Sequence, residues 1–182
     1  QVQVSALSTL QLSQLGSAQA LGLTATQLGT VSTTNVSTLS TQAVAGLTTA
    51  ALTGMSTAQV NALTTTQIKS LTTTQAAGLG GAQALGLGSS QLTALNTDDL
   101  SKLSAAAVSS LRSSALAGLT STQVGSLQST QVAALTAQQA GGLTGEQTVN
   151  LSSSQAKALA VGVLSGLTTA ALSSMNTDAL SS

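Results

Sequence analysis

The chain has 182 residues, of which 42% are hydrophobic, none is aromatic and only 4% are charged. Four basic residues balance four acidic ones, whereas about a quarter of the residues of an ordinary soluble protein are charged. We expect no binding to nucleic acid, because such sparse charge cannot neutralise a phosphate backbone. The chain also lacks His and Cys, which removes the commonest general base, thiol nucleophiles and most zinc ligands.

The dominant feature of the sequence is an eight-residue repeat, the octad, which runs through the whole chain without an insertion or deletion. Counted from Leu7 in steps of eight, all 22 positions up to Met175 are large aliphatic residues, and 19 of them are Leu. We call the large aliphatic residue at each of these places position one of its octad. Position two is Ser or Thr in 14 octads, position five is Gln in 13, and position six is apolar in all but the octad that carries Thr148. We therefore expect one array over residues 1–182, without separate domains.

Each octad carries the signals that begin a short α-helix. Ser or Thr at the N-cap accepts a hydrogen bond from the backbone N–H three residues later, and a Gln at that later position accepts one from the N–H of the cap. The Leu before the cap can pack on the residue at position six, which is the pattern of a hydrophobic staple. The predicted core residues in the clearest octads are Leu63, Ile68, Leu71, Leu127, Val132 and Leu135, and the predicted capping residues are Thr64, Gln67, Thr72, Gln75 and Gln131.

Glycine at position eight predicts where these helices end. A residue in the left-handed region closes a helix at little cost when it is Gly, so each octad is expected to hold about five helical residues and then stop. The glycines at this position are Gly22, Gly46, Gly54, Gly78, Gly86, Gly118, Gly142 and Gly166.

The spacing of the apolar positions argues against long elements. In one continuous helix, each Leu would lie about 80° around the axis from the last, so the apolar stripe would wind away from any partner. In one continuous strand, successive apolar side chains would point to opposite faces. A helix of about five residues is too short to be stable alone, so neighbouring octads must stabilise it. We predict an all-α solenoid with one very short helix per octad; a β-solenoid with a turn in every octad is the alternative, because Thr and Val favour strands.

A weaker similarity recurs at a spacing of eight octads. Two consecutive octads have Ala at position five, namely Ala43 and Ala51. The same pair occurs eight octads later, at residues 107 and 115, and again after another eight octads, at residues 171 and 179. This spacing indicates either a superhelical turn or a duplicated block.

We predict no catalytic, metal or cofactor site. The stretch Gly78-Leu79-Gly80-Gly81 lacks the Lys-Ser/Thr that completes a phosphate-binding loop. The acidic pair Asp98-Asp99 beside Lys102 has the residues of a weak cation site or an acid pair. The sequence favours solvated charge at a helix start, because Asn96 occupies the cap position and acids favour the first turn. A membrane span is not expected either, because the longest apolar run, residues 158–164, falls far short of about 20 residues.

Three octads carry a resemblance to a known class of repeats: Leu63-Thr64-Thr65-Thr66-Gln67-Ile68, Leu71-Thr72-Thr73-Thr74-Gln75 and Leu127-Gln128-Ser129-Thr130-Gln131-Val132. They resemble the LTxxQ-type tandem repeats of large bacterial secreted and cell-surface proteins, and the resemblance covers essentially the whole chain. It implies bacterial origin, export and a surface or matrix role, and it supplies no catalytic residues.

Together these features predict a structural protein of the cell surface or extracellular space. The chain begins with Gln1-Val2-Gln3-Val4, without Met or an apolar leader, so we expect a secreted chain, either mature after cleavage or an excerpt of a longer one. The repeat reaches both ends without a polar capping octad, which predicts head-to-tail stacking of copies into a filament, sheath or surface layer. The alternatives are an adhesin stalk, or an ice- or glycan-binding surface made of Thr runs.

Overall fold

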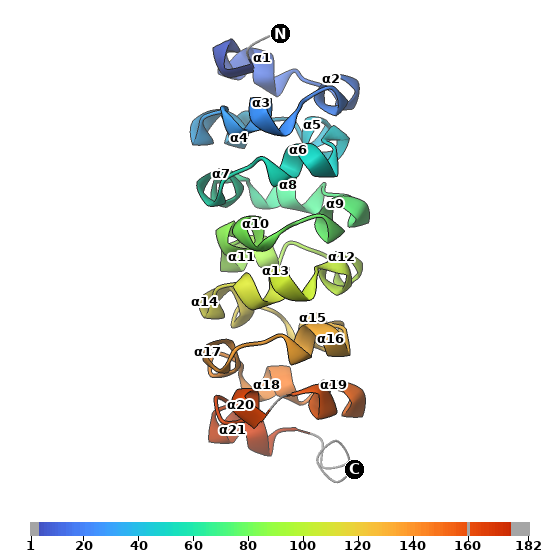
Figure 1. Cartoon of the computed structure of the whole chain (residues 1–182), viewed down its shortest axis with the longest axis vertical. Helices are drawn as coiled ribbons and strands as arrows, with labels where there is room; N and C mark the ends of the chain where they lie inside the picture. Colours follow the sequence, from blue (N-terminus) through green and yellow to red (C-terminus); the bar gives the residue numbers. More distant parts are fainter. Residues whose placement is uncertain (1–3, 160, 176–182) are drawn as a thin grey trace.

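The structure, a computed structural model, describes residues 4–159 and 161–175 (Figure 1). In these residues the chain forms 21 α-helices of four to six residues, one in each octad, preceded by one short 3-10 helix, and it forms no strand. The prediction of an all-α solenoid is confirmed. The β-solenoid alternative is wrong, because the capping boxes that the sequence encodes begin helices in the structure.

The helices follow one another with only a few residues between them. Their bounds are η1 (Val4–Ala6), α1 (Thr9–Ser13), α2 (Ser17–Leu21), α3 (Ala25–Gly29), α4 (Thr33–Thr38), α5 (Thr41–Gly46), α6 (Thr49–Thr53), α7 (Thr57–Ala62), α8 (Thr65–Lys69), α9 (Thr73–Ala77), α10 (Gly81–Gly86), α11 (Ser89–Leu92), α12 (Thr97–Lys102), α13 (Ala105–Ser110), α14 (Ser113–Leu116), α15 (Ser121–Gly125), α16 (Ser129–Ala133), α17 (Ala137–Ala140), α18 (Gly145–Thr148), α19 (Ser153–Ala158), α20 (Val161–Leu164) and α21 (Thr169–Ser173).

The helices wind into an elongated stack in which each turn lies on the turn before it (Figure 1). A helix packs mainly on the helix three places along the chain, as α2 does on α5 and α10 does on α13. Most side-chain hydrogen bonds between turns join residues 25 to 31 apart in sequence, with 28 as the recurring value. One turn therefore takes about three and a half octads. The eight-octad spacing of the Ala pairs exceeds two turns, so it marks a repeated block rather than a superhelical turn.

Where a helix extends to position eight of its octad, two extended residues separate it from the next helix. At the end of α7, Leu63 has φ −61° and ψ 136°, and the following N-cap, Thr64, has φ −72° and ψ 158°. The helix ends there because these two residues, at positions one and two, take the backbone conformation that the next capping box requires. The signal that starts each helix thus also ends the one before it.

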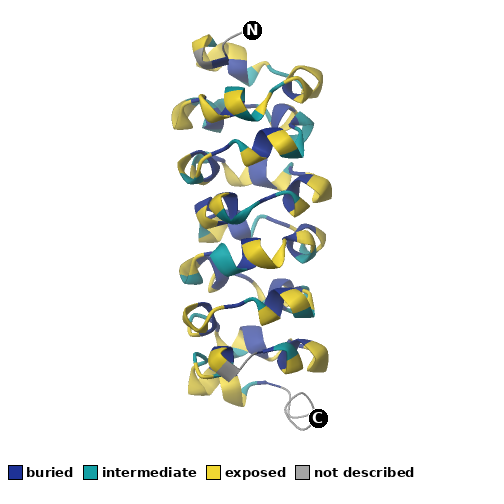
Figure 2. Cartoon of the chain, in the orientation of Figure 1, coloured by how far each residue is buried: buried dark blue, intermediate teal, exposed yellow. Residues whose placement is uncertain are grey.

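The side chains at positions one and six form most of the core, and Figure 2 shows buried residues in every turn of the stack. The six core residues predicted from the clearest octads are all buried. The polar exception at position six, Thr148, is fully buried as well, and its hydroxyl donates to the carbonyl of Ala171 at 2.7 Å. Apart from this residue, small and aliphatic side chains fill the two positions, which leaves most Ser and Thr side chains on the outside.

The prediction that position-eight glycines adopt the left-handed region is wrong. No described residue, glycine or otherwise, has a positive φ. These glycines instead let adjacent turns approach closely. A Cβ on Gly46 would lie 2.5 Å from the backbone of Ser17, which precedes it by one turn, and a Cβ on Gly86 would lie 2.5 Å from the carbonyl oxygen of Thr57. Most other position-eight glycines face the equivalent residue of the preceding turn in the same way, so their role is to leave space between turns.

Replacing one of these glycines by Ala tests whether their role is to leave space between adjacent turns. Gly46→Ala is expected to lower the free energy of unfolding by about 1–3 kcal/mol, because the new methyl group overlaps the backbone of Ser17. Gly22→Ala is the matched control, since its Cβ would make only an ordinary contact, 3.5 Å from the carbonyl oxygen of Gln19. It should be neutral or stabilising by up to about 1 kcal/mol. Chemical denaturation followed by circular dichroism measures both, and equal stabilisation by the two changes would contradict close approach as the role.

Candidate functional site

The recurrent polar group of this structure is the Gln side chain at position five, which makes bonds within its own octad and across to the preceding turn. In α8, Gln67 Oε1 accepts a hydrogen bond from the N–H of Thr64 at 2.7 Å, while Thr64 Oγ1 accepts one from the N–H of Gln67 at 3.2 Å. The amide nitrogen of the same Gln donates to the carbonyls of Val36 at 2.9 Å and Leu39 at 2.7 Å. We call this arrangement the glutamine clamp.

Between Gln59 and Gln155, ten glutamines form the clamp with the same register to described residues. In each, Nε2 donates to the carbonyl of the position-one residue 28 residues earlier, at 2.6 to 2.9 Å. All ten side chains are buried. A buried carbonyl or amide without a partner costs about 1–3 kcal/mol, so the clamp satisfies groups that the close packing of turns would otherwise leave unpaired. The ten residues are Gln59, Gln67, Gln75, Gln83, Gln91, Gln123, Gln131, Gln139, Gln147 and Gln155.

The structure places the predicted capping residues at the starts of three helices. Thr72 and Gln75 form a capping box at the start of α9, as Thr64 and Gln67 do in α8. Gln131 accepts from the backbone N–H of Gln128 at 2.6 Å, although the Gln128 side chain makes no cap hydrogen bond.

Sequence reasoning found the half of each clamp that lies within an octad and missed the half that spans two turns. The missed signal is the identity of the residue at position five. Glu would serve the capping box as well as Gln, yet no octad has Glu at this position and 13 have Gln. A uniform choice of amide over carboxylate indicates that the NH2 group has a partner, because that group is what distinguishes the two side chains.

Clamped octads alternate with short runs that lack the clamp. Five consecutive octads, from Gln59 to Gln91, are clamped, and the next three carry Asp99, Ala107 and Ala115 at position five. The same order, five Gln and then three other residues, follows in the next eight octads. In the run that contains Ala43, a hydroxyl from position two takes over part of the role: Ser40 Oγ donates to the carbonyl of Leu15 at 2.6 Å.

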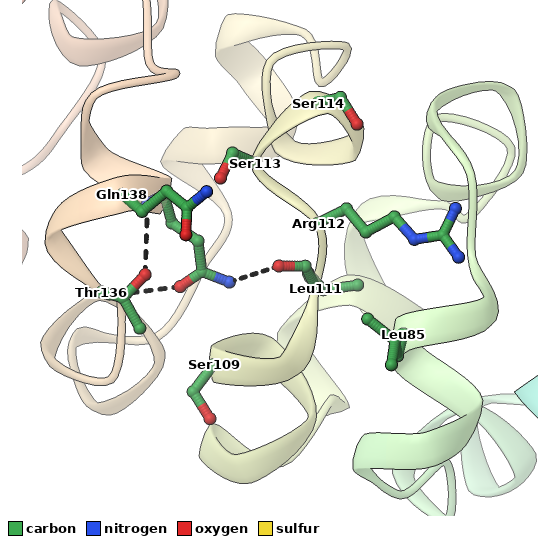
Figure 3. Close-up of a pocket in the computed structure, with 9 residues that line it drawn as sticks. Leu85, Ser109, Leu111, Arg112, Ser113, Ser114, Thr136 and Gln138 are labelled. Atoms are coloured by element: carbon green, nitrogen blue, oxygen red, sulfur yellow. Dashed lines mark hydrogen bonds between the residues drawn. The ribbon is translucent and has the colours of Figure 1, made fainter.

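A shallow pocket of about 540 Å³ lies on the surface where α10, α13, α14 and α17 meet. Arg112 occupies the N-cap position of α14 without a side-chain cap bond. Figure 3 shows its guanidinium group extending away from Gln138 and Thr136, on the side of the ribbon where Leu85 lies. The lining offers hydroxyl, amide and guanidinium groups and no carboxylate; it consists of Leu85, Ser109, Leu111, Arg112, Ser113, Ser114, Thr136, Gln138 and Gln139.

The structure agrees with the predicted solvated charge at Asp98 and contradicts it at Asp99. Asn96 Oδ1 accepts from the N–H of Asp99 at 2.8 Å, as expected of an N-cap, and Asp98 is exposed. Asp99, however, is only 1% exposed, so the prediction of solvated charge at this helix start is wrong for this residue, which occupies position five and faces the core.

The described residues contain neither a candidate metal-binding cluster nor a membrane-spanning helix. They hold no group of three or more acidic, His or Cys side chains placed to bind a metal. No helix in the described ranges has the length and hydrophobicity to cross a membrane.

Two adjacent residues of α17 allow a matched test of the clamp. Gln139→Glu keeps the acceptor of the capping box, removes both donors and places a carboxylate beside the carbonyls of Val108 and Leu111. We expect it to lower the free energy of unfolding by about 2–4 kcal/mol. Gln138→Glu, which adds the same charge at an exposed site of the same helix, should change it by less than about 0.5 kcal/mol. Similar losses from both variants in urea denaturation would mean that added charge, and not the clamp, is responsible.

Residues 36–73 match the family model described as the ALTTAQ repeat. This segment contains α5 to α8 and the clamps of Gln59 and Gln67. No curated protein and no solved structure gave a match to the chain. The predicted tandem-repeat character is confirmed, while the bacterial surface class stays a prediction. The chain is thus a tandem-repeat protein that folds as an all-α solenoid, with a segment similar to the ALTTAQ repeat.

Proposed function

We propose that this chain is a structural subunit, or a segment, of an extracellular bacterial filament, sheath or surface layer. The observation that carries the proposal is the constant register of the contacts between turns. The clamp of each turn meets the carbonyls of the preceding turn 28 residues away, in ten octads and with the same atoms. Because every clamped turn presents the same donors on one side and the same acceptors on the other, turns of two copies could pack as turns of one chain do.

The outer surface suits assembly at high local concentration. The described charged side chains, apart from Asp99, are exposed, and they number only six. The remainder of the surface is largely Ser and Thr, as at Thr64, Thr65 and Thr66. Little repulsion therefore opposes the approach of copies, since low net charge favours association.

The first described turn offers a face for such packing. A pocket of about 510 Å³, mostly apolar, is lined there by Val4, Leu7, Leu15 and Leu23, together with parts of α2 and α3. These three leucines are only partly buried, whereas their equivalents from Leu39 to Leu159 are buried under the preceding turn. A turn packed as the turns within the chain are packed would cover this face, and in the proposed assembly a second copy supplies that turn. Because the contact joins two different surfaces and does not close on itself, it would extend into a filament.

The elongated shape favours a stalk or spacer as the second candidate (Figure 1). A stalk would use the same stack as a monomer that holds another domain at a distance. A flat Thr-rich surface for ice or glycan has less support. The runs Thr64–Thr66 and Thr72–Thr74 belong to the consecutive octads of α8 and α9, which occupy different sides of the stack in Figure 1.

Assembly of the purified 182-residue chain tests the proposal. Electron microscopy is expected to show filaments one solenoid wide, and light scattering should show their growth with protein concentration. Leu15→Lys places a charge in the apolar face and should raise the concentration needed for half-assembly by at least about tenfold, which corresponds to about 1.4 kcal/mol.

Leu10→Lys is the control, because Leu10 is 70% exposed and does not line that face. It should assemble like the unmodified chain, with circular dichroism verifying that both variants are folded. Monodisperse monomers of the unmodified chain at all concentrations would contradict the filament and leave the stalk. Filaments that form equally well with Leu15→Lys would contradict the proposed face.

A further inference from the structure

Asp99 is the one described charged residue that is buried, and both its carboxylate oxygens lack a hydrogen-bond partner. The cap bond from its own N–H to Asn96 uses the backbone and leaves the carboxylate unpaired. The basic residues that follow it most closely, Lys102 on α12 and Arg112 at the start of α14, are exposed, as is Lys69 on the preceding turn. Acidic side chains are almost never fully buried unless they are paired or bound to a metal, so this carboxylate requires a positive partner.

The register of the clamp identifies the groups that lie opposite Asp99. A Gln at position five donates to the carbonyls 28 and 31 residues earlier, as Gln67 does to Leu39 and Val36. For residue 99 these carbonyls belong to Leu71 and Ile68, which are both buried. The packing of α12 on α9, which begins two residues after Leu71, agrees with this register.

The side chain at this position is shorter than that of its neighbours. Asp lacks one methylene group of Gln and has no NH2 group, so an atom corresponding to Nε2 is missing between the carboxylate and the two carbonyls. In the clamps, Nε2 lies 2.6 to 2.9 Å from the position-one carbonyl. By the register of the clamp, the oxygens expected around that place are those of the Asp99 carboxylate and of the two backbone carbonyls, a donor set that hard cations accept.

We propose that Asp99, with the carbonyl oxygens of Leu71 and Ile68, binds a hard metal cation in the place that the Gln amide nitrogen occupies in the clamped octads. Among divalent ions Ca²⁺ fits best, since it takes carboxylate and carbonyl ligands at about 2.3–2.6 Å in irregular geometry. Mg²⁺ demands a near-octahedral shell at shorter distances and keeps its waters, so it fits poorly. The ion would bridge α12 to the turn before it and replace the clamp at the start of an unclamped run.

Removal and return of the ion in the full chain test this site. The chain is treated with EDTA and then titrated with Ca²⁺, with Na⁺ and with Mg²⁺, while thermal unfolding is followed by circular dichroism. With Ca²⁺ at a hundred times its dissociation constant, the melting temperature is expected to rise by at least about 5 °C. Titration calorimetry should give one Ca²⁺ per chain. A rise with Na⁺ in place of Ca²⁺ supports the same site with a monovalent occupant, and Mg²⁺ should have little effect.

Variants of the acidic pair separate the buried site from the surface. Asp99→Gln should abolish binding and the ion dependence, and it should melt at or above the temperature of the Ca²⁺-loaded chain, because it restores a clamp. Asp98→Asn removes the same charge from an exposed neighbour in the same helix and should retain one bound ion.

Two results would overturn the proposal. The first is a melting temperature that responds to neither Ca²⁺ nor Na⁺; if it then rises as the pH is lowered from 7 to 5, the partner is a proton. The second is loss of binding with Asp98→Asn as complete as with Asp99→Gln, which would indicate a surface acid pair.

Discussion

The side-chain amide of Gln at position five stabilises both the individual helix and the packing of one turn on the next. A helix of four to six residues cannot persist alone in water, because the cost of starting it exceeds what so few hydrogen bonds return. At position five, the oxygen of the Gln side chain fixes the start of its own helix and the nitrogen holds the preceding turn. Forming the helix and docking it are therefore coupled, which explains how a column without aromatic residues or long elements can be ordered.

The sequence predicts the parts of this fold that depend on local rules. The cap at Thr64, the buried Leu63 and Ile68 and the single helix per octad all follow from interactions within eight residues. The length of a turn does not, because it depends on how far a Gln amide reaches across to a carbonyl 28 residues away. Nothing in one octad encodes that distance.

Two errors of prediction have the same physical origin. Glycine at position eight has two uses, a left-handed backbone or the absence of a Cβ, and only the position of the neighbouring turn decides between them, as at Gly46 against Ser17. The prediction of a solvated Asp99 rests on its place in the first turn of a helix, where acids are usual. Its burial follows from the preceding turn, which covers position five throughout the wound part of the stack.

The alternation of clamped and unclamped octads has a mechanical consequence. A pulling force along the axis of the stack acts on the contacts between adjacent turns. The contacts that lack a Gln amide have fewer hydrogen bonds to resist this force. Those turns would open first, while the five clamped octads on either side stay wound. One opened turn of 28 residues could extend to about 90–100 Å of chain. Because such contacts recur every eight octads, they would let the proposed filament lengthen in steps under strain and shorten again when the strain is released.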